Sequence, residues 1–262
     1  MGSLQLQGST SGSVTLIVPS VAGSSVLTLP AVTDTLVGLS ATQTLTGKTL
    51  TSAALSAGTA TAAPLNLTSG TNLTTATAGA MEYDGTVFYA TPTALQRGVI
   101  MAEQIILLQS AYTLTSQTAA QAMFNTPAGG QVTLTTGTYE FECFYSLSAM
   151  SASSGSFGFA LGGTATKTQF FWSLAAKGSP LATTTAANST YNVTAANTAL
   201  SAASVNTVGY ANISGIINVS VSGTVIPQVS LGVAAAAVVG IGAYFRIRPI
   251  GSTTVTSVGN WS

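Results

Sequence analysis

Apolar and polar residues alternate with a period of two along the second half of the chain, and this pattern most constrains the fold. In residues 138–148, TYEFECFYSLS, the odd positions are apolar, and most even positions are polar. The same parity recurs near the C-terminus at Val225, Pro227, Val229, Leu231 and Val233. Side chains of a β-strand point to opposite faces in turn, so both stretches predict half-buried strands.

Further β-prone runs are separated by clusters of Gly, Ser, Thr and Asn. They cover residues 103–115, 156–163, 168–177, 210–223, 223–233 and 242–251. Many antiparallel strands with such punctuation predict an all-β sandwich or jelly roll of about 160 residues, which we assign to residues 101–262. Little helix is expected, apart from a short Ala-rich helix over residues 117–124, capped by Ser116 and stopped by Pro127 with its neighbouring glycines.

The longest apolar run, VAAAAVVGIGA at residues 233–243, is too short to cross a bilayer, because a transmembrane helix needs about 20 residues. We interpret it as a buried strand and expect no membrane segment. The first residues show no basic stretch followed by an apolar one, so we also expect no secretory signal.

Residues 1–80 contain no aromatic side chain and only two charges, Asp34 and Lys48. Such a segment buries too little surface to form a compact domain alone, so we interpret it as an extended attachment arm that needs neighbours. Its β-prone runs lie at residues 14–21 and 26–32, and within them Pro19 and Pro30 end the extended stretches. A repeated Thr-Leu-Thr unit follows at 41–52. A disordered linker is the alternative. Residues 81–100 form the expected neck, with a hairpin at MEYDGTVFY that turns at Asp84-Gly85.

Charge is scarce throughout the chain. Only 5% of its residues are Asp, Glu, Lys or Arg, and six acidic residues balance six basic ones. Without a net positive field, we expect no binding to nucleic acid. The single cysteine, Cys143, lies on a predicted strand among aromatic residues, so an inert buried thiol is expected rather than a metal site or a disulfide.

The chain has no histidine, which removes the usual Ser-His triads, the commonest general base and most zinc sites. Glu140 and Glu142 project from one face of one strand, where a glycosidase pair or a calcium site is conceivable. No second acidic cluster supports either, so we expect no catalysis, no metal and no cofactor. Glu82 and Asp84 are interpreted as the solvated tip of the neck hairpin.

A structural role suits the paired acids better. Arg246 and Arg248 are also two residues apart on a predicted strand, so the two acids and the two bases form ladders of equal spacing. We hypothesise that these ladders pair, across strands or across subunits.

Other candidate positions concern packing and ligands. The run Ala234, Ala235, Ala236 and Ala237 suits close backbone approach, as at a threefold axis, or else plain sheet packing. Trp172 and Trp261 suit sugar stacking, although buried aromatic residues are more common in a sandwich.

Several stretches resemble bacteriophage proteins. GSTSGSVTLIVPSVAGSSVLTLPAVTDTLV, TLTGKTLTS, AGAMEYDGTVFYAT and QRGVI are similar to the anchoring and neck segments of phage fibre and structural proteins. TAAQAMFNT, TLTTGTYEFECFYSLSAMSASSGSFGFAL, GTVIPQVSL and GNWS look like a trimeric jelly-roll head of the TNF/C1q type. The resemblance implies a homotrimeric virion component on the exterior of the particle, joined to other virion proteins by its arm. It supplies no catalytic residues and fits heads and tails alike.

Three function classes remain open from the sequence. The first is a short trimeric fibre or decoration spike of a phage virion. The second is a receptor-binding tail fibre that recognises a glycan on the host surface. The third is a bacterial surface adhesin or C1q-like binding module, against which the expected lack of a secretory signal counts.

Overall fold

The chain is all-β. A computed structural model describes residues 3–7, 10–17, 53–125, 130–153, 155–178, 188–192, 198–199 and 207–253. Within these ranges there is no helix, and every strand pairing is antiparallel. It follows that this part of the chain offers no helix able to span a membrane. The backbone divides into two compact units, Met1–Ala57 and Gly58–Ser262.

The first unit contains a hairpin of strands β1 (Ser3–Gln7) and β2 (Ser13–Ile17). The run predicted at residues 14–21 is therefore confirmed as a strand up to residue 17. The rest of that run lies outside the described residues, as do the runs at 26–32 and 41–52 with Pro19 and Pro30. Leu6 is exposed on this hairpin, which has no core of its own within the described residues.

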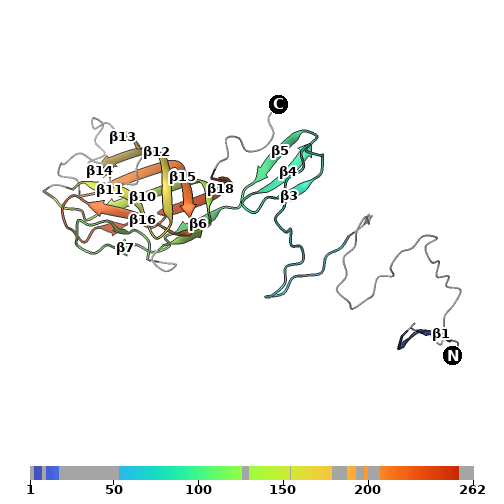
Figure 1. The fold of residues 1–262 in the computed structure, drawn as a ribbon. Helices are drawn as coiled ribbons and strands as arrows, with labels where there is room; N and C mark the ends of the chain where they lie inside the picture. The colour runs from blue at the N-terminus through green and yellow to red at the C-terminus, as the bar shows by residue number, and fades with distance from the viewer. Residues whose placement is uncertain are drawn as a thin grey trace. The chain divides into compact units, whose positions relative to one another are not determined.

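The neck forms a three-stranded sheet of β3 (Met81–Tyr83), β4 (Phe88–Thr93) and β5 (Gln96–Ile100) (Figure 1). The predicted hairpin at Asp84-Gly85 is confirmed, and Gly85 has a positive φ of 97°. The Asp84 carboxylate caps the turn, because Oδ1 accepts hydrogen bonds from the backbone N–H groups of Thr86 and Val87, each at 2.8 Å. Part of the predicted arm packs here as well, since the N–H of Gly70 donates to the carbonyl of Tyr83.

Two larger sheets form the head. The eight-stranded sheet begins with the order β13-β12-β15-β10, and β10 then pairs with both β18 and β17. Beyond them, β18 pairs with β6, and β17 pairs with β7. Its strands are β6 (Gln104–Leu107), β7 (Tyr112–Thr113), β10 (Gly137–Ser148), β12 (Thr166–Gly178), β13 (Asn188–Asn192), β15 (Gly209–Val221), β17 (Val238–Val239) and β18 (Tyr244–Gly251). The five-stranded sheet contains β8 (Gln121–Ala122), β9 (Val132–Leu134), β11 (Phe157–Gly162), β14 (Thr198–Ala199) and β16 (Gly223–Leu231).

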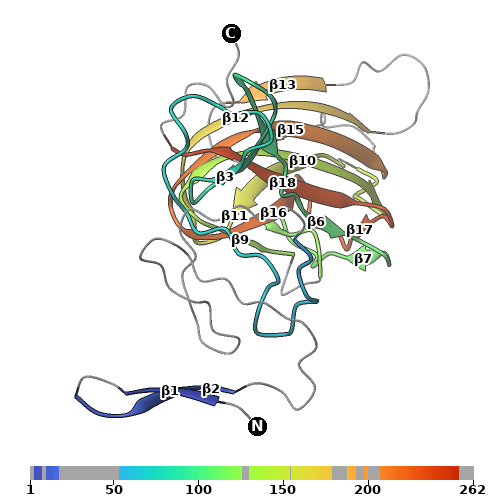
Figure 2. The ribbon, with the colours of Figure 1, turned by 90° about the vertical axis from the view of Figure 1, so that its right-hand side faces the viewer.

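The chain passes repeatedly between these two sheets along the head. β10, β12, β15 and β18 belong to the larger sheet, whereas β11 and β16 belong to the smaller one. Figure 2 shows β12, β15, β10 and β18 side by side. This winding is consistent with a jelly roll. It confirms the all-β antiparallel fold and most of the predicted strands, although the run at 103–115 is divided into β6 and β7.

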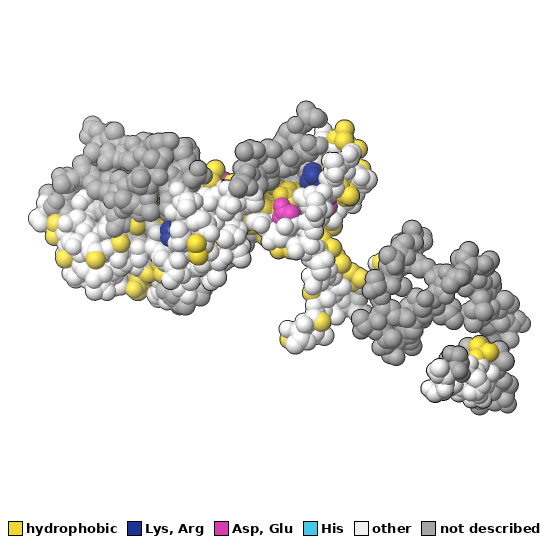
Figure 3. Space-filling model, in the orientation of Figure 1, with side chains coloured by type: hydrophobic (Ala, Val, Ile, Leu, Met, Phe, Trp, Pro, Cys, Tyr) yellow, Lys and Arg dark blue, Asp and Glu magenta, His cyan; other side chains and the backbone are white. Residues whose placement is uncertain are grey.

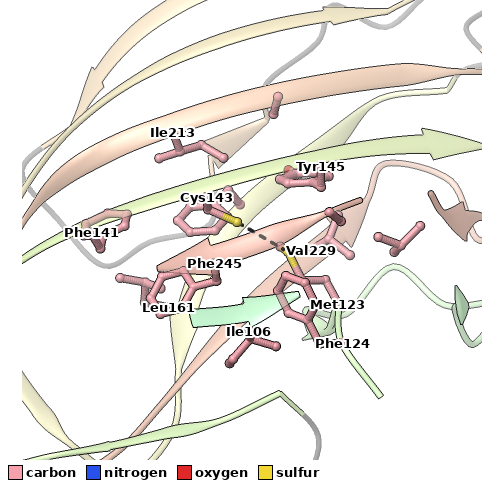
Figure 4. Close-up of a cluster of buried hydrophobic side chains, with 14 of the residues drawn as sticks. Ile106, Met123, Phe124, Phe141, Cys143, Tyr145, Leu161, Ile213, Val229 and Phe245 are labelled. Carbon is pink, nitrogen blue, oxygen red and sulfur yellow. Dashed lines mark hydrogen bonds between the residues drawn. The ribbon is translucent and has the colours of Figure 1, made fainter. Parts of the chain in front are cut away.

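The core lies between the two sheets. Odd-numbered residues of β10 point inward, as the alternation predicted, and Phe141, Cys143 and Tyr145 are buried there. Aromatic rings from the two sheets pack against each other, since the ring centroids of Phe141 on β10 and Phe159 on β11 are 6.3 Å apart. Cys143 is buried, as expected. It is fully buried, burial raises its pKa well above the usual value, and its Sγ lies 3.7 Å from the Sδ of Met123 (Figure 4).

The predicted helix over residues 117–124 is wrong. This stretch is irregular apart from β8, which pairs with β16. Met123 and Phe124 are both buried in the core, and the side-chain amide of Gln121 bonds to the backbone of Thr115 at 2.8 and 2.9 Å. Helices shorter than about 12 residues are marginal alone, so packing of these two apolar side chains outweighs local propensity.

The interpretation of residues 233–243 as one buried strand is also wrong. Only Val238–Val239 form strand β17, and a turn follows in which Gly242 has a φ of 86°. Val233 and Ile241 are exposed. Outside Val238–Val239 the run forms no strand, and its alanine and glycine residues supply few of the side-chain contacts that stabilise a sheet.

Candidate subunit interface

The outer face of the eight-stranded sheet brings the predicted charged residues together. Even-numbered residues of β10 and β18 point away from the core, as the register of the two strands requires. In this register Glu140 lies opposite Arg248, and Glu142 lies opposite Arg246. The two ladders therefore meet across neighbouring strands of one chain.

Both pairs form close ionic contacts. Arg248 Nη2 lies 2.6 Å from Glu140 Oε2, and Arg246 Nη2 lies 2.5 Å from Glu142 Oε2. Glu103, just before β6, adds a longer contact of 3.9 Å to Arg246 Nε. Each of the two arginines thus has a carboxylate partner, and the group presents little unpaired charge.

Tyr244 completes this cluster, and the sequence reasoning missed it. Its hydroxyl donates a hydrogen bond to Glu142 Oε1. That bond, together with Arg246, lowers the pKa of Glu142, while the carboxylate in turn raises the pKa of Tyr244. The residue spacing could have predicted this position, because Tyr244 precedes Arg246 by two residues on the same strand and therefore lies on the same face.

Apolar side chains surround the charged cluster. Tyr244 lies opposite Phe144 on β10 and opposite Leu107 on β6, and the rings of Phe144 and Tyr244 stack at 6.1 Å. Phe144 is 37% exposed, Leu107 50% and Ile105 59%. Large apolar side chains gathered on one exposed sheet face, around charges that are already paired, have the composition of an interface. On the face that Figure 3 draws, charged side chains are few among the described residues.

The same geometry does not suit glycosidase chemistry. The hollow between Glu140, Glu142 and the two arginines has a volume of only about 30 Å³. That space holds roughly one water molecule, not a sugar ring. Both carboxylates are also held by guanidinium groups. Within the described residues no group of three or more acidic or thiol side chains is arranged to hold a metal ion.

The alanine run lies between β16 and β17. Ala235 and Ala237 point inward, Ala237 is fully buried, and its carbonyl accepts a hydrogen bond from the N–H of Leu114 at 2.8 Å. Ala234 and Ala236 are exposed. Sheet packing therefore accounts for half of the run, and contact at a threefold axis stays a prediction for the other half.

The interpretation of Glu82 and Asp84 as a solvated hairpin tip is wrong. Glu82 Oε2 lies 2.8 Å from Arg97 Nε, and both side chains are largely buried. Asp84 accepts two backbone hydrogen bonds and a third from the hydroxyl of Tyr89 at 2.8 Å. Its pKa is lowered, because these bonds outweigh the opposing effect of burial. Both acids thus stabilise the neck.

The two candidate sugar-stacking residues cannot be placed. The side chain of Trp172 and the whole of Trp261 lie outside the described residues.

Comparison of the chain with models of known protein families and with curated proteins finds no match.

Proposed function

We propose that this chain is a bacteriophage virion structural protein, a short homotrimeric fibre or decoration spike. Residues 1–80 attach it to other virion proteins, and a TNF/C1q-like jelly-roll head faces outward on the exterior of the particle. The observation that carries the proposal is the outer face of the eight-stranded sheet, where exposed apolar side chains surround charges that are already paired.

A second copy of the chain is the partner that this face fits. Burying an unpaired charge is expensive, whereas Glu140 and Glu142 already have arginine partners within the chain. Covering Ile105, Leu107 and Phe144 adds hydrophobic stabilisation of about 25 cal/mol per Å² of apolar surface. Most oligomers of soluble proteins are closed and symmetric, and the resemblance to TNF/C1q-type heads implies three copies.

The arm provides the attachment. Its described hairpin, β1 and β2, has an exposed apolar side chain at Leu6 and two strand edges. Free strand edges bind partners by strand addition, in which backbone hydrogen bonds supply affinity. The head has a core of its own and does not need such help.

Two measurements test the proposal. Light scattering of the purified chain should give the mass of three copies at micromolar concentration, and a stable monomer would count heavily against it. A chain lacking residues 1–57, the first compact unit, should remain a β-rich trimer but fail to join the particle, whereas residues 58–80 are kept because part of this segment packs on the neck. Normal copy number of this truncated chain in virions would show that the head is the anchor. A reconstruction of the particle with a few copies at the tail tip would favour a receptor-binding fibre instead.

A further inference from the structure

Residues 70–80, the last part of the predicted arm, form a strap that is bonded to the neck sheet at both ends. At the start of the strap, the N–H of Gly70 donates to the carbonyl of Tyr83 on β3 at 2.9 Å. At its end, the N–H of Gly79 donates to the carbonyl of Thr91 on β4 at 2.7 Å. The strap therefore belongs to the folded neck.

Between these ends, two charged side chains of the neck bind the backbone of Leu73. The N–H of Leu73 donates to Glu82 Oε1 at 2.5 Å, and its carbonyl accepts from Arg97 Nη2 at 2.6 Å. Glu82 and Arg97 also bind each other, with 2.8 Å between Glu82 Oε2 and Arg97 Nε. They lie on β3 and β5, the two strands that flank β4. One residue of the strap is thus held by both members of an ion pair.

This contact recognises the backbone of Leu73 rather than its side chain. Leu73 is 48% exposed, so packing of its side chain contributes little. A carboxylate only accepts hydrogen bonds and a guanidinium only donates them, so Glu82 matches the N–H and Arg97 matches the carbonyl. A pair with the charges exchanged would offer each backbone group the wrong partner.

Burial makes the contact costly to break. The side chains of Arg97 and Glu82 are only 14% and 11% exposed. Removing one member of a buried ion pair leaves the other charge uncompensated, which is strongly destabilising. The strap is also packed, because Ala76, three residues beyond Leu73, is buried. Loss of either charge should therefore release the strap.

We infer that Glu82 and Arg97 form a clamp that closes the strap and thereby sets where the attachment arm begins. With the strap closed, the arm ends at the boundary between the two compact units, after Ala57. With the strap released, residues 58–80 join the arm, and each added residue extends its reach by at most about 3.6 Å. The inference rests on the proposed attachment role of the arm and identifies the residues that fix its base.

Limited proteolysis of the full chain measures where the arm begins. Thermolysin cleaves unfolded segments on the N-terminal side of leucine, and Leu73 is such a position within the strap. The resistant fragment of the native chain, identified by its mass, should retain Leu73. In Arg97→Met, cleavage before Leu73 should be about ten- to a hundredfold faster. Equal rates in the two chains would overturn the inference.

The charge-swapped double variant Glu82→Arg, Arg97→Glu separates a clamp from a simple ion pair. It keeps two opposite charges on β3 and β5 but turns donors toward the N–H of Leu73 and acceptors toward its carbonyl. A clamp predicts cleavage before Leu73 as fast as in Arg97→Met. Native resistance in the swapped chain would show that the ion pair alone suffices, and would reject the clamp. Gln96→Met, at the exposed neighbouring position of β5, is the matched control and should be cleaved like the native chain.

Hydrogen exchange of Arg97→Met shows whether the strap opens separately from the sheet. Amides of residues 70–80 should exchange faster by a larger factor than those of β4 and β5, because the strands keep their own pairing. Equal acceleration over the strap and the strands would show that the ion pair stabilises the whole sheet, and the clamp would be refuted.

Incorporation into virions separates this inference from the proposed function. Neither proteolysis nor exchange depends on the particle. Fast cleavage in Arg97→Met, with normal copy number of the chain lacking residues 1–57, would leave the clamp standing and reject the attachment role of the arm. Equal cleavage of the native chain and Arg97→Met, with loss of the truncated chain from virions, would reject the clamp and leave the proposed function standing.

Discussion

Tyr145→Phe should make this protein more stable. Tyr145 is 0% exposed at the centre of the core, and its hydroxyl has no hydrogen-bond partner among the residues that the structure describes. Its ring packs edge-on against Phe157 with the centroids 6.0 Å apart, and phenylalanine keeps that contact. Only the unsatisfied oxygen is lost.

The magnitude follows from two opposing effects. A buried hydroxyl without a partner costs about 1–3 kcal/mol of stability. Removing it leaves a void the size of one oxygen atom, which costs a few tenths of a kcal/mol at roughly 24 cal/mol per Å³. The free energy of unfolding should therefore rise by about 1–2 kcal/mol. For a unit of this size the Tm should rise by about 2–8 °C.

Tyr139→Phe is the matched control. Tyr139 lies on the same strand and the same face, but its hydroxyl donates to the carbonyl of Thr135 at 3.0 Å. Losing that bond should lower the free energy of unfolding by about 0.5–1.5 kcal/mol. Urea titration and calorimetry of the native chain and both variants give the comparison, at one chain concentration because self-association would add to the measured stability.

The opposite sign for Tyr145→Phe would refute the reasoning. A loss of stability equal to that of Tyr139→Phe would show that the Tyr145 hydroxyl is bonded, for instance to a buried water. Equal stability of the native chain and Tyr145→Phe would show that the orphan hydroxyl carries no penalty.

Three further predictions concern the outer face and one strained residue. Replacing Arg246 and Arg248 with glutamate should weaken trimer assembly in light scattering, and adding arginine at positions 140 and 142 should restore it; unchanged assembly of the double variant would reject a role for these charges. The pKa of Glu142 in the folded chain is lowered from 4.5, so the ionised carboxylate stabilises the fold fully above that value and loses this effect as the pH falls through the folded pKa. In melting scans between about pH 7 and pH 3, the Tm of Glu142→Gln should therefore converge on that of the native chain at the acid end. Ala149 has a φ of 55°, so Ala149→Gly should stabilise the chain by up to about 1 kcal/mol in urea titration, and a loss would show that its backbone is unstrained.

Local pattern was sufficient wherever one strand face is buried. The alternation in residues 138–148 predicted β10 because its odd-numbered side chains reach the core, and the turn at Asp84-Gly85 follows from residues that tolerate a positive φ. The spacing of Glu140 and Glu142 likewise matched that of Arg246 and Arg248, since residues two apart on a strand share a face.

Tertiary contacts decided what local pattern could not. Residues 117–124 are irregular rather than helical because Met123 and Phe124 fill space between the sheets. The local sequence of these eight residues does not show that their side chains are needed in the core. Glu82 meets Arg97 only because β3 and β5 flank β4, and Tyr244 reaches Glu142 across a strand pair more than a hundred residues apart. The period of two in the sequence shows which face of a strand is apolar. Which side chains come into contact depends on the order of the strands in the sheet, and contacts between residues distant in the chain determine that order.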